Sequence, residues 1–114
     1  MEKKVNIMVE RETYEKKGKE YFSYYIKGLL RGQPVKAGIK PPDIGGYTLL
    51  DIIFNGEMSA ELVVTPFEMK ADNGDVISGN TYKVVSYDED GTIYECPVKP
   101  ARATDKAALK MLLR

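Results

Sequence analysis

Apolar and polar residues alternate along much of the chain, and this alternation predicts a series of short β-strands. The first run, residues 5–10, has a period of two, which is typical of a strand with one buried face. Residues 21–30 are rich in aromatic and β-branched side chains, which favour strands. A third alternating run, residues 35–40, ends at Pro41 and Pro42, neither of which can donate to a strand ladder. We therefore expect an antiparallel meander of three strands.

The segment 47–54 fits two structures. Its apolar residues have a spacing that would suit two turns of a helix ending at Asn55-Gly56. The same Asn-Gly pair also suits a hairpin turn into the next apolar run, residues 60–69. On that ground we expect a strand over 47–54.

A hairpin is the strongest local signal in the second half of the chain. Asp90-Gly91 lies between two β-rich runs, residues 82–87 and 92–98. No internal repeat is visible that would divide the chain into similar units.

The C-terminal residues predict the last element, a short helix over residues 106–113 that Thr104 or Asp105 would cap. With five to seven short strands before it, the pattern predicts one mostly β domain over residues 1–114. The regular spacing of strands and turns favours a small antiparallel β-barrel or a strongly bent sheet.

Charge is distributed unevenly along this chain of zero net charge. Residues 1–40 carry ten Lys and Arg against five Asp and Glu, residues 41–95 carry two against eleven, and residues 96–114 carry five against one. Such segregation can build a basic face, which attracts polyanions. The alternative is that the charges mix again on folding.

Catalytic and metal-binding chemistry finds little support in the composition. The chain has no histidine, which removes the commonest general base and transition-metal ligand. We therefore expect no enzymatic activity, no metal site and no cofactor. The single cysteine, Cys96, fits a reducing cytoplasm, and no apolar run is long enough to span a membrane.

The best candidate site is one face of the second predicted strand. Tyr21 and Tyr25 lie two positions on either side of Ser23, between Lys19 and Lys27. Lysines from neighbouring segments would extend this surface: Lys16 and Lys17 in the preceding turn, and Lys36 and Lys40 on the third strand. Exposed aromatic rings stack on nucleic-acid bases at about 1–3 kcal/mol per base, and the cations neutralise phosphates. The alternative is that the tyrosines cover a second small core or simply face water.

Two stretches resemble a known family. Residues 18–21 leading into a Tyr-rich strand, then residues 33–35, look like the opening of the small single-stranded-DNA-binding proteins of filamentous phages and mobile elements. Residues 79–100 are similar in layout to the last hairpin of those proteins. The resemblance implies an OB-like β-barrel that binds single strands cooperatively, usually as a dimer. By position, it makes Tyr21 and Tyr25 stacking residues and Lys19 and Lys27 phosphate contacts.

These patterns together predict a sequence-tolerant single-stranded-DNA-binding protein of a phage or mobile element. Its partner would be single-stranded nucleic acid, and the resemblance implies a homodimer. The alternative hypothesis is a protein-interaction or assembly module that uses the acidic segment 41–95.

Overall fold

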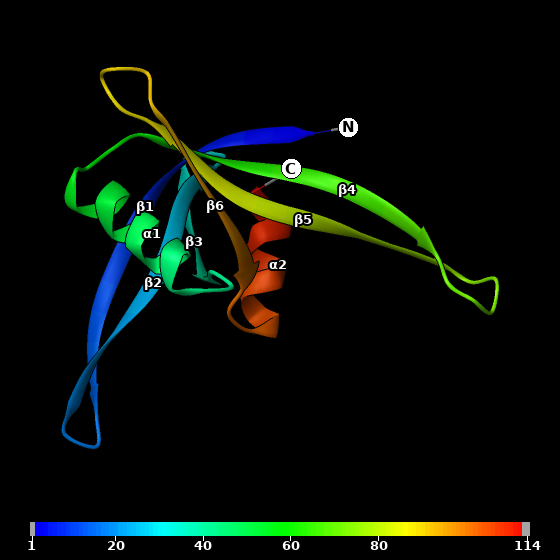
Figure 1. The fold of residues 1–114 in the computed structure, drawn as a ribbon, viewed down its shortest axis with the longest axis horizontal. Helices are drawn as coiled ribbons and strands as arrows, with labels where there is room; N and C mark the ends of the chain where they lie inside the picture. The colour runs from blue at the N-terminus through cyan, green and yellow to red at the C-terminus, as the bar shows by residue number, and fades with distance from the viewer. Residues whose placement is uncertain (1, 113–114) are drawn as a thin grey trace.

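The computed structural model describes residues 2–112 and has a mostly β fold with a short C-terminal helix, as predicted (Figure 1). The elements in chain order are β1 (Lys3–Lys16), β2 (Lys19–Leu30), β3 (Gln33–Lys40), α1 (Ile44–Asn55), β4 (Ala60–Lys70), β5 (Val76–Tyr87), β6 (Ile93–Pro100) and α2 (Ala103–Leu112). The hairpin at Asp90-Gly91 is confirmed, because it joins β5 to β6. Helix α2 begins at Ala103, before both predicted capping residues, so that detail is wrong, and residue 113 lies outside the described residues.

All six strands pair in an antiparallel ring. Their order is β1-β2-β3-β6-β5-β4, and β4 pairs back onto β1. Each half of the chain is a three-stranded meander followed by a helix. The two halves are equivalent in their pairing. When β1, β2 and β3 exchange places with β4, β5 and β6, the same pairs of strands result. The fold therefore has a two-fold topological repeat, which the sequence analysis missed.

Residues 47–54 lie in helix α1, so the expected strand is wrong. The helix starts because the side chain of Asp43 accepts a hydrogen bond from the Gly46 amide at 3.0 Å, which satisfies one of the free N–H groups of the first turn. Gly46, Leu50 and Ile53 are buried at helical spacing. Gly56 ends the helix by donating to the Ile52 carbonyl at 3.0 Å. Asn55-Gly56 therefore terminates a helix and does not turn a hairpin.

Helix α2 completes the ring where β3 and β6 separate. The two strands pair only at their ends, through Ile39 with Pro100 and Lys40 with Lys99. Beyond that point Asp105 takes the place of a strand partner: its carboxylate accepts a hydrogen bond from the Gly38 amide at 2.9 Å. A Cβ at position 38 would lie 2.9 Å from the Asp105 carboxylate, so a larger residue there would displace the carboxylate that accepts this hydrogen bond. The hydrophobic core inside the ring includes inward residues of all six strands, Leu50 and Ile53 of α1, and Leu109 and Leu112 of α2.

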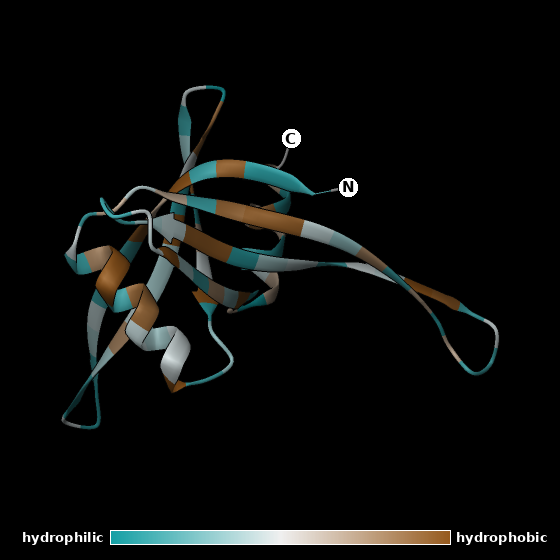
Figure 2. Ribbon diagram, turned by 45° about the horizontal axis from the view of Figure 1, so that its top comes forward, coloured by the Kyte–Doolittle hydropathy of each residue, from teal (hydrophilic) through white to brown (hydrophobic). Residues whose placement is uncertain are grey.

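Two long hairpins extend from the ring in different directions (Figure 1). The first arm, residues 12–23, is the outer part of the β1–β2 hairpin, and the second arm, residues 65–81, is the outer part of the β4–β5 hairpin. Each arm lies beyond the residues that pair with a third strand, so the two arms are equivalent in the two-fold repeat. Figure 2 shows that the tip of the first arm is hydrophilic, whereas apolar residues occur close to the tip of the second.

Candidate nucleic-acid interface

The predicted tyrosines and lysines of β2 share one face of the sheet. Antiparallel partners point to the same side, and the register places Tyr14, Glu12 and Glu10 of β1 opposite Tyr21, Ser23 and Tyr25. Lys36 of β3 lies opposite Lys27 on the same face. The meander therefore brings Tyr21, Tyr25, Lys27 and Lys36 to one surface, together with acidic residues that the sequence analysis did not include.

Acidic side chains of β1 neutralise the middle of this face. Lys27 Nζ lies 3.8 Å from one oxygen of Glu10, and Lys36 Nζ lies 3.9 Å from the other. Lys36 also donates a hydrogen bond to Glu12, and this bond is the largest cause of the raised pKa of the Lys36 ammonium. The Lys36 ammonium lies 4.2 Å from the centroid of the Tyr25 ring, so it covers part of that ring. Two of the predicted phosphate contacts are thus engaged within the protein.

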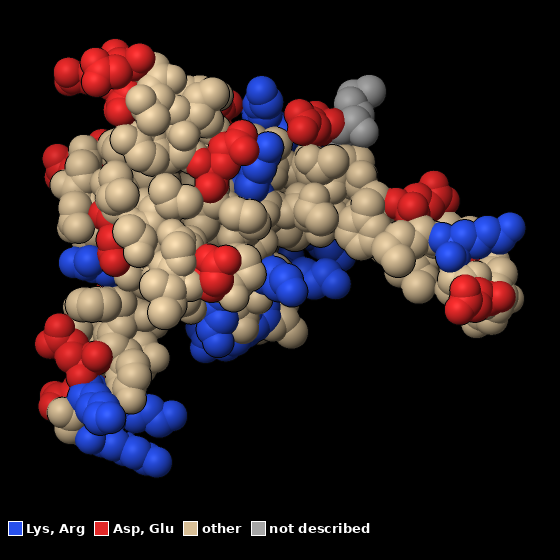
Figure 3. Space-filling view, in the orientation of Figure 1, with Lys and Arg blue, Asp and Glu red and all other residues tan. Residues whose placement is uncertain are grey.

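The other predicted cations are free of such contacts within residues 2–112. Lys16, Lys17 and Lys19 surround the turn of the first arm, where Lys17 and Gly18 both have positive φ, 52° and 75°. This conformation is typical of a tight two-residue hairpin. All three side chains are exposed, and the tip of the arm carries a group of blue side chains with red ones beside it (Figure 3). Lys40 lies apart from them, at the end of β3.

An exposed aromatic pair lies just behind the tip. The rings of Tyr14 and Tyr21 stack with centroids 5.5 Å apart and planes inclined by 22°. They remain 46% and 42% exposed, so each ring has surface free to contact a further planar group. The sequence analysis missed Tyr14 because it ended the first strand at residue 10. Extension of the strand through Lys16 would have placed Tyr14 opposite Tyr21.

A groove of about 780 Å³, here called the first groove, runs along the free edge of β2. Its walls come from the first arm, the end of β3, helix α1 and the segment that follows β6. Six aromatic side chains line it, namely Tyr14, Tyr21, Phe22, Tyr24, Tyr25 and Tyr47. Lys40 and Arg102 lie on the wall nearest the ring, and Glu12 and Asp105 also line the groove. The tip lysines and these two cations therefore lie at opposite ends of an aromatic surface.

A hydrogen-bonded network fixes one wall of the first groove. Asp51 of α1 accepts hydrogen bonds at one oxygen from the Tyr24 hydroxyl at 2.6 Å and from Arg11 at 3.1 Å. The Arg11 guanidinium also lies 4.5 Å from the centroid of the Phe22 ring. Phe22 is 44% exposed because it lies on the arm, beyond the ring.

This network predicts a specific dependence of stability on pH. Burial, followed by the hydrogen bond to Asp51, raises the pKa of Tyr24 from 10.0 to about 12. Between these values the unfolded chain releases a proton that the folded chain retains, so stability falls as pH rises. The difference in free energy of unfolding between the wild type and Tyr24→Phe should therefore be constant below pH 10 and disappear toward pH 12. Urea unfolding of the wild type and of Tyr24→Phe across this range measures it, and a constant difference would contradict the assignment.

Cys96 is fully buried, and burial raises the pKa of its thiol to about 11, so it is poorly suited to nucleophilic chemistry. Among the described residues, no group of three or more Cys, Asp or Glu is placed to hold a metal ion. Neither helix in the described part of the chain has the length and apolar character needed to cross a bilayer.

Comparisons with known proteins identify no relative: no family model matches the chain, and neither a curated protein nor a solved structure gives a significant match.

Proposed function

We propose that this protein binds single-stranded nucleic acid in the first groove, with single-stranded DNA as the first candidate. The observation that carries the proposal is the exposed Tyr14–Tyr21 stack, which lies between the lysines of the arm tip and the cations beside β3. Every base has a π-face, so stacking on these rings accepts any sequence. The groove opens along the edge of a two-stranded ribbon, and this shape suits a flexible single strand better than a duplex.

The proposed phosphate contacts differ in part from those expected from the sequence. Lys16, Lys17, Lys19 and Lys40 stay in the set. Arg102 joins it because it lines the groove and its side chain is 73% exposed, although its Nε lies 3.6 Å from Asp105. Lys27 and Lys36 contribute less, because Glu10 and Glu12 already neutralise them. An OB-fold has five strands, whereas this ring has six. The proposal therefore rests on the chemistry of the groove, and a phage or mobile-element origin and a homodimer remain predictions.

Fluorescence anisotropy with a labelled single strand, at increasing salt, tests the proposal. Binding should weaken linearly on a log–log plot with a slope of about −3.5, since each phosphate contact to a single strand contributes about −0.7. A duplex of the same length should bind more weakly, and an RNA strand measured in parallel defines the type of nucleic acid. Undetectable binding at low salt, or binding that salt does not change, would contradict the proposal.

Removal of the two acidic side chains should strengthen binding. In Glu10→Gln with Glu12→Gln, Lys27 and Lys36 lose their intramolecular partners and become available to phosphates. We expect affinity for a single strand to rise about tenfold at about 0.1 M salt and the salt slope to steepen by about 1.4. Little stability should be lost, because exposed ion pairs contribute about 0–1 kcal/mol.

The matched control variant also removes two negative charges, but at positions away from the first groove. Glu57 and Glu89 are exposed and do not line the first groove. Glu57→Gln with Glu89→Gln should alter affinity by less than about twofold at moderate salt, where charges farther apart than about 10 Å are screened. Equal gains in both double variants would show that net charge, and not this face, determines binding.

A protein partner is the second candidate function, and the second arm favours it. Phe67, Met69 and Ile77 lie on one face of that arm and are 38%, 57% and 49% exposed. The acidic segment itself does not form one surface, because its charged turns at 72–75 and 88–90 lie at different extremities (Figures 1 and 3). A nuclease-resistant partner that is lost in Phe67→Ser with Met69→Ser would support this function.

A further inference from the structure

We infer that a second groove, related to the first by the two-fold repeat of the fold, binds the phosphate backbone of the same single strand. This inference rests on the proposed function and extends it: the ligand would be a strand long enough to cross from one groove to the other. Three observations carry it, namely the equivalence of the grooves, a row of cations along α2, and a pair of like charges where the grooves meet.

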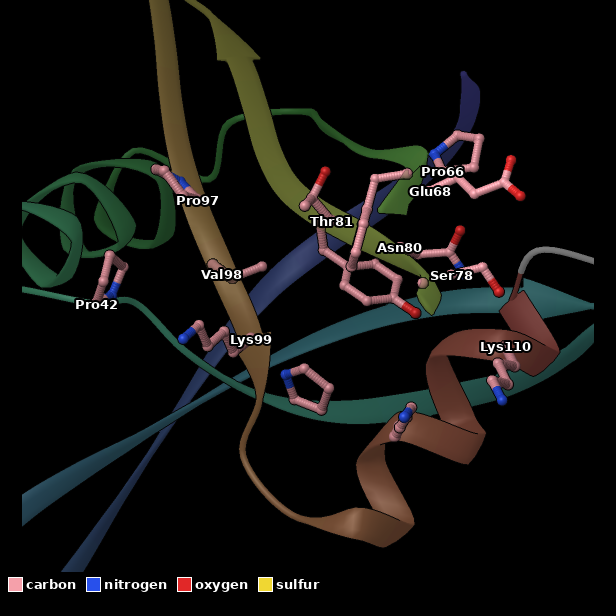
Figure 4. Close-up of a pocket in the computed structure, with 15 residues that line it drawn as sticks. Pro42, Pro66, Glu68, Ser78, Asn80, Thr81, Pro97, Val98, Lys99 and Lys110 are labelled. Atoms are coloured by element: carbon pink, nitrogen blue, oxygen red, sulfur yellow. The ribbon is translucent and has the colours of Figure 1, made fainter. Parts of the chain in front are cut away.

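The second groove has a volume of about 1190 Å³ and lies between the second arm, β6 and α2 (Figure 4). The first groove lies between the first arm, the end of β3 and α1. The segment after β3 contributes Pro42 to the second groove, and the segment after β6 contributes Arg102 to the first. Both grooves are therefore built from corresponding elements of the two halves of the chain.

Most of the charged side chains that line the second groove are lysines. Lys99, Lys106 and Lys110 line it, and Glu68 is its one acidic lining residue. As far as residues 2–112 are concerned, no carboxylate forms an ion pair with any of these three lysines. Phe67 is the one exposed aromatic side chain on its walls, since Tyr82 is only 8% exposed. This composition suits phosphates more than stacked bases.

A row of cations along α2 connects the two grooves. Arg102, Lys106 and Lys110 are four residues apart, a spacing that places them on one face of a helix. The Lys106 amide donates to the Arg102 carbonyl at 3.2 Å, so the helical geometry already includes Arg102. Arg102 lines the first groove, whereas Lys106 and Lys110 line the second. The row spans about 12 Å at 1.5 Å per residue, and Lys and Arg gather over α2 in the space-filling view (Figure 3).

The junction of the grooves contains two like charges placed opposite one another. Lys40 of β3 and Lys99 of β6 are direct cross-strand partners, an arrangement that is unfavourable in an isolated protein. Lys40 lines the first groove and Lys99 the second. A phosphate bound between them would remove the repulsion, so the ligand that fits this junction is a polyanion that passes from one groove into the other.

The dependence of affinity on strand length tests the inference. Anisotropy is measured with oligothymidylates of about 4 to about 16 nucleotides, the range of site sizes known for small single-strand-binding domains. For the wild type, affinity should continue to rise after the first groove is filled. In Lys99→Gln with Lys106→Gln and Lys110→Gln, binding of the shortest strand should change less than about twofold. The long strand should lose about tenfold or more, and its salt slope should become shallower by about 2.

The control variant carries the same charge change outside both grooves. Lys3, Lys4 and Lys70 are exposed and line neither groove. Lys3→Gln with Lys4→Gln and Lys70→Gln should reproduce the length dependence of the wild type. A thermal melt of each variant confirms folding, and Lys99→Gln alone should not lower the melting temperature, because it removes a repulsion.

The possible outcomes separate the inference from the function on which it rests. Binding of short strands without a further gain for long ones, or a long-strand affinity that the triple variant retains, would overturn the second groove and leave the proposed function intact. Equal losses for short and long strands would also overturn it. Failure of the wild type to bind any strand would overturn both.

Discussion

Replacement of Tyr14 and Tyr21 with alanine should weaken binding of a single strand by about tenfold to a hundredfold. The reason is the loss of the stacked pair, whose rings are 46% and 42% exposed in the free protein. One stacked base contributes about 1–3 kcal/mol, and 1.4 kcal/mol corresponds to a factor of ten in affinity. The salt slope should stay close to that of the wild type, because no cation is removed. Anisotropy titrations at two or more salt concentrations measure both quantities.

Two controls distinguish stacking from a general loss of structure. Tyr14→Phe with Tyr21→Phe keeps the aromatic faces and should bind within about threefold of the wild type. Tyr87 is 50% exposed at the end of β5 and lines neither groove, so Tyr87→Ala should have no effect on affinity. Wild-type affinity in the Tyr14 and Tyr21 alanine variant would exclude the first arm as a base-stacking surface.

Replacement of Gly46 with alanine should destabilise the fold by about 1–3 kcal/mol. Helix α1 approaches the ring closely at this residue: a Cβ on Gly46 would overlap Pro41 and would lie 3.3 Å from Cys96 Sγ. Both neighbours are held in place, since Pro41 is buried and Cys96 is fully buried in the core. Insertion of a methyl group into such a site costs energy through displaced backbone and side chains. Urea unfolding gives the free energy directly.

The adjacent glycine provides the control. A Cβ at Gly45 would contact only Asp43, at 3.4 Å, and Gly45 is exposed. Gly45→Ala should therefore be neutral or stabilising by up to about 1 kcal/mol, because alanine favours helix more than glycine does. Similar effects of the two substitutions would mean that α1 is not seated against Pro41 and Cys96.

Sequence periodicity predicted the strands well and one helix poorly. The alternating runs of the first forty residues correspond to β1, β2 and β3, and the Asp90-Gly91 hairpin is confirmed. The helix α1 was misread because Asn55-Gly56 is compatible with both a hairpin and a helix end. Two other signals favoured helix, namely Asp43 at the capping position and the spacing of Gly46, Leu50 and Ile53.

Tertiary pairing determined the parts of the site that periodicity did not reveal. A single strand pattern shows which residues of β2 share a face, but not which residues of β1 lie opposite them. Glu10 and Glu12 are distant from Lys27 and Lys36 in sequence, and only the register brings them into ion pairs. Arg102 and the second groove depend on the closure of the ring between β3 and β6. These features follow from strand order, which one sequence does not specify.

Intrinsic tyrosine fluorescence during titration with a long oligothymidylate tests the central claim most directly. The chain has eight tyrosines and no tryptophan, so the emission reports on the phenol rings themselves. We predict that the strand quenches this emission at low salt, that added salt reverses the quenching, and that the Tyr14 and Tyr21 alanine variant shows much less of it. Unchanged emission in the wild type, or equal quenching in the variant, would contradict the account.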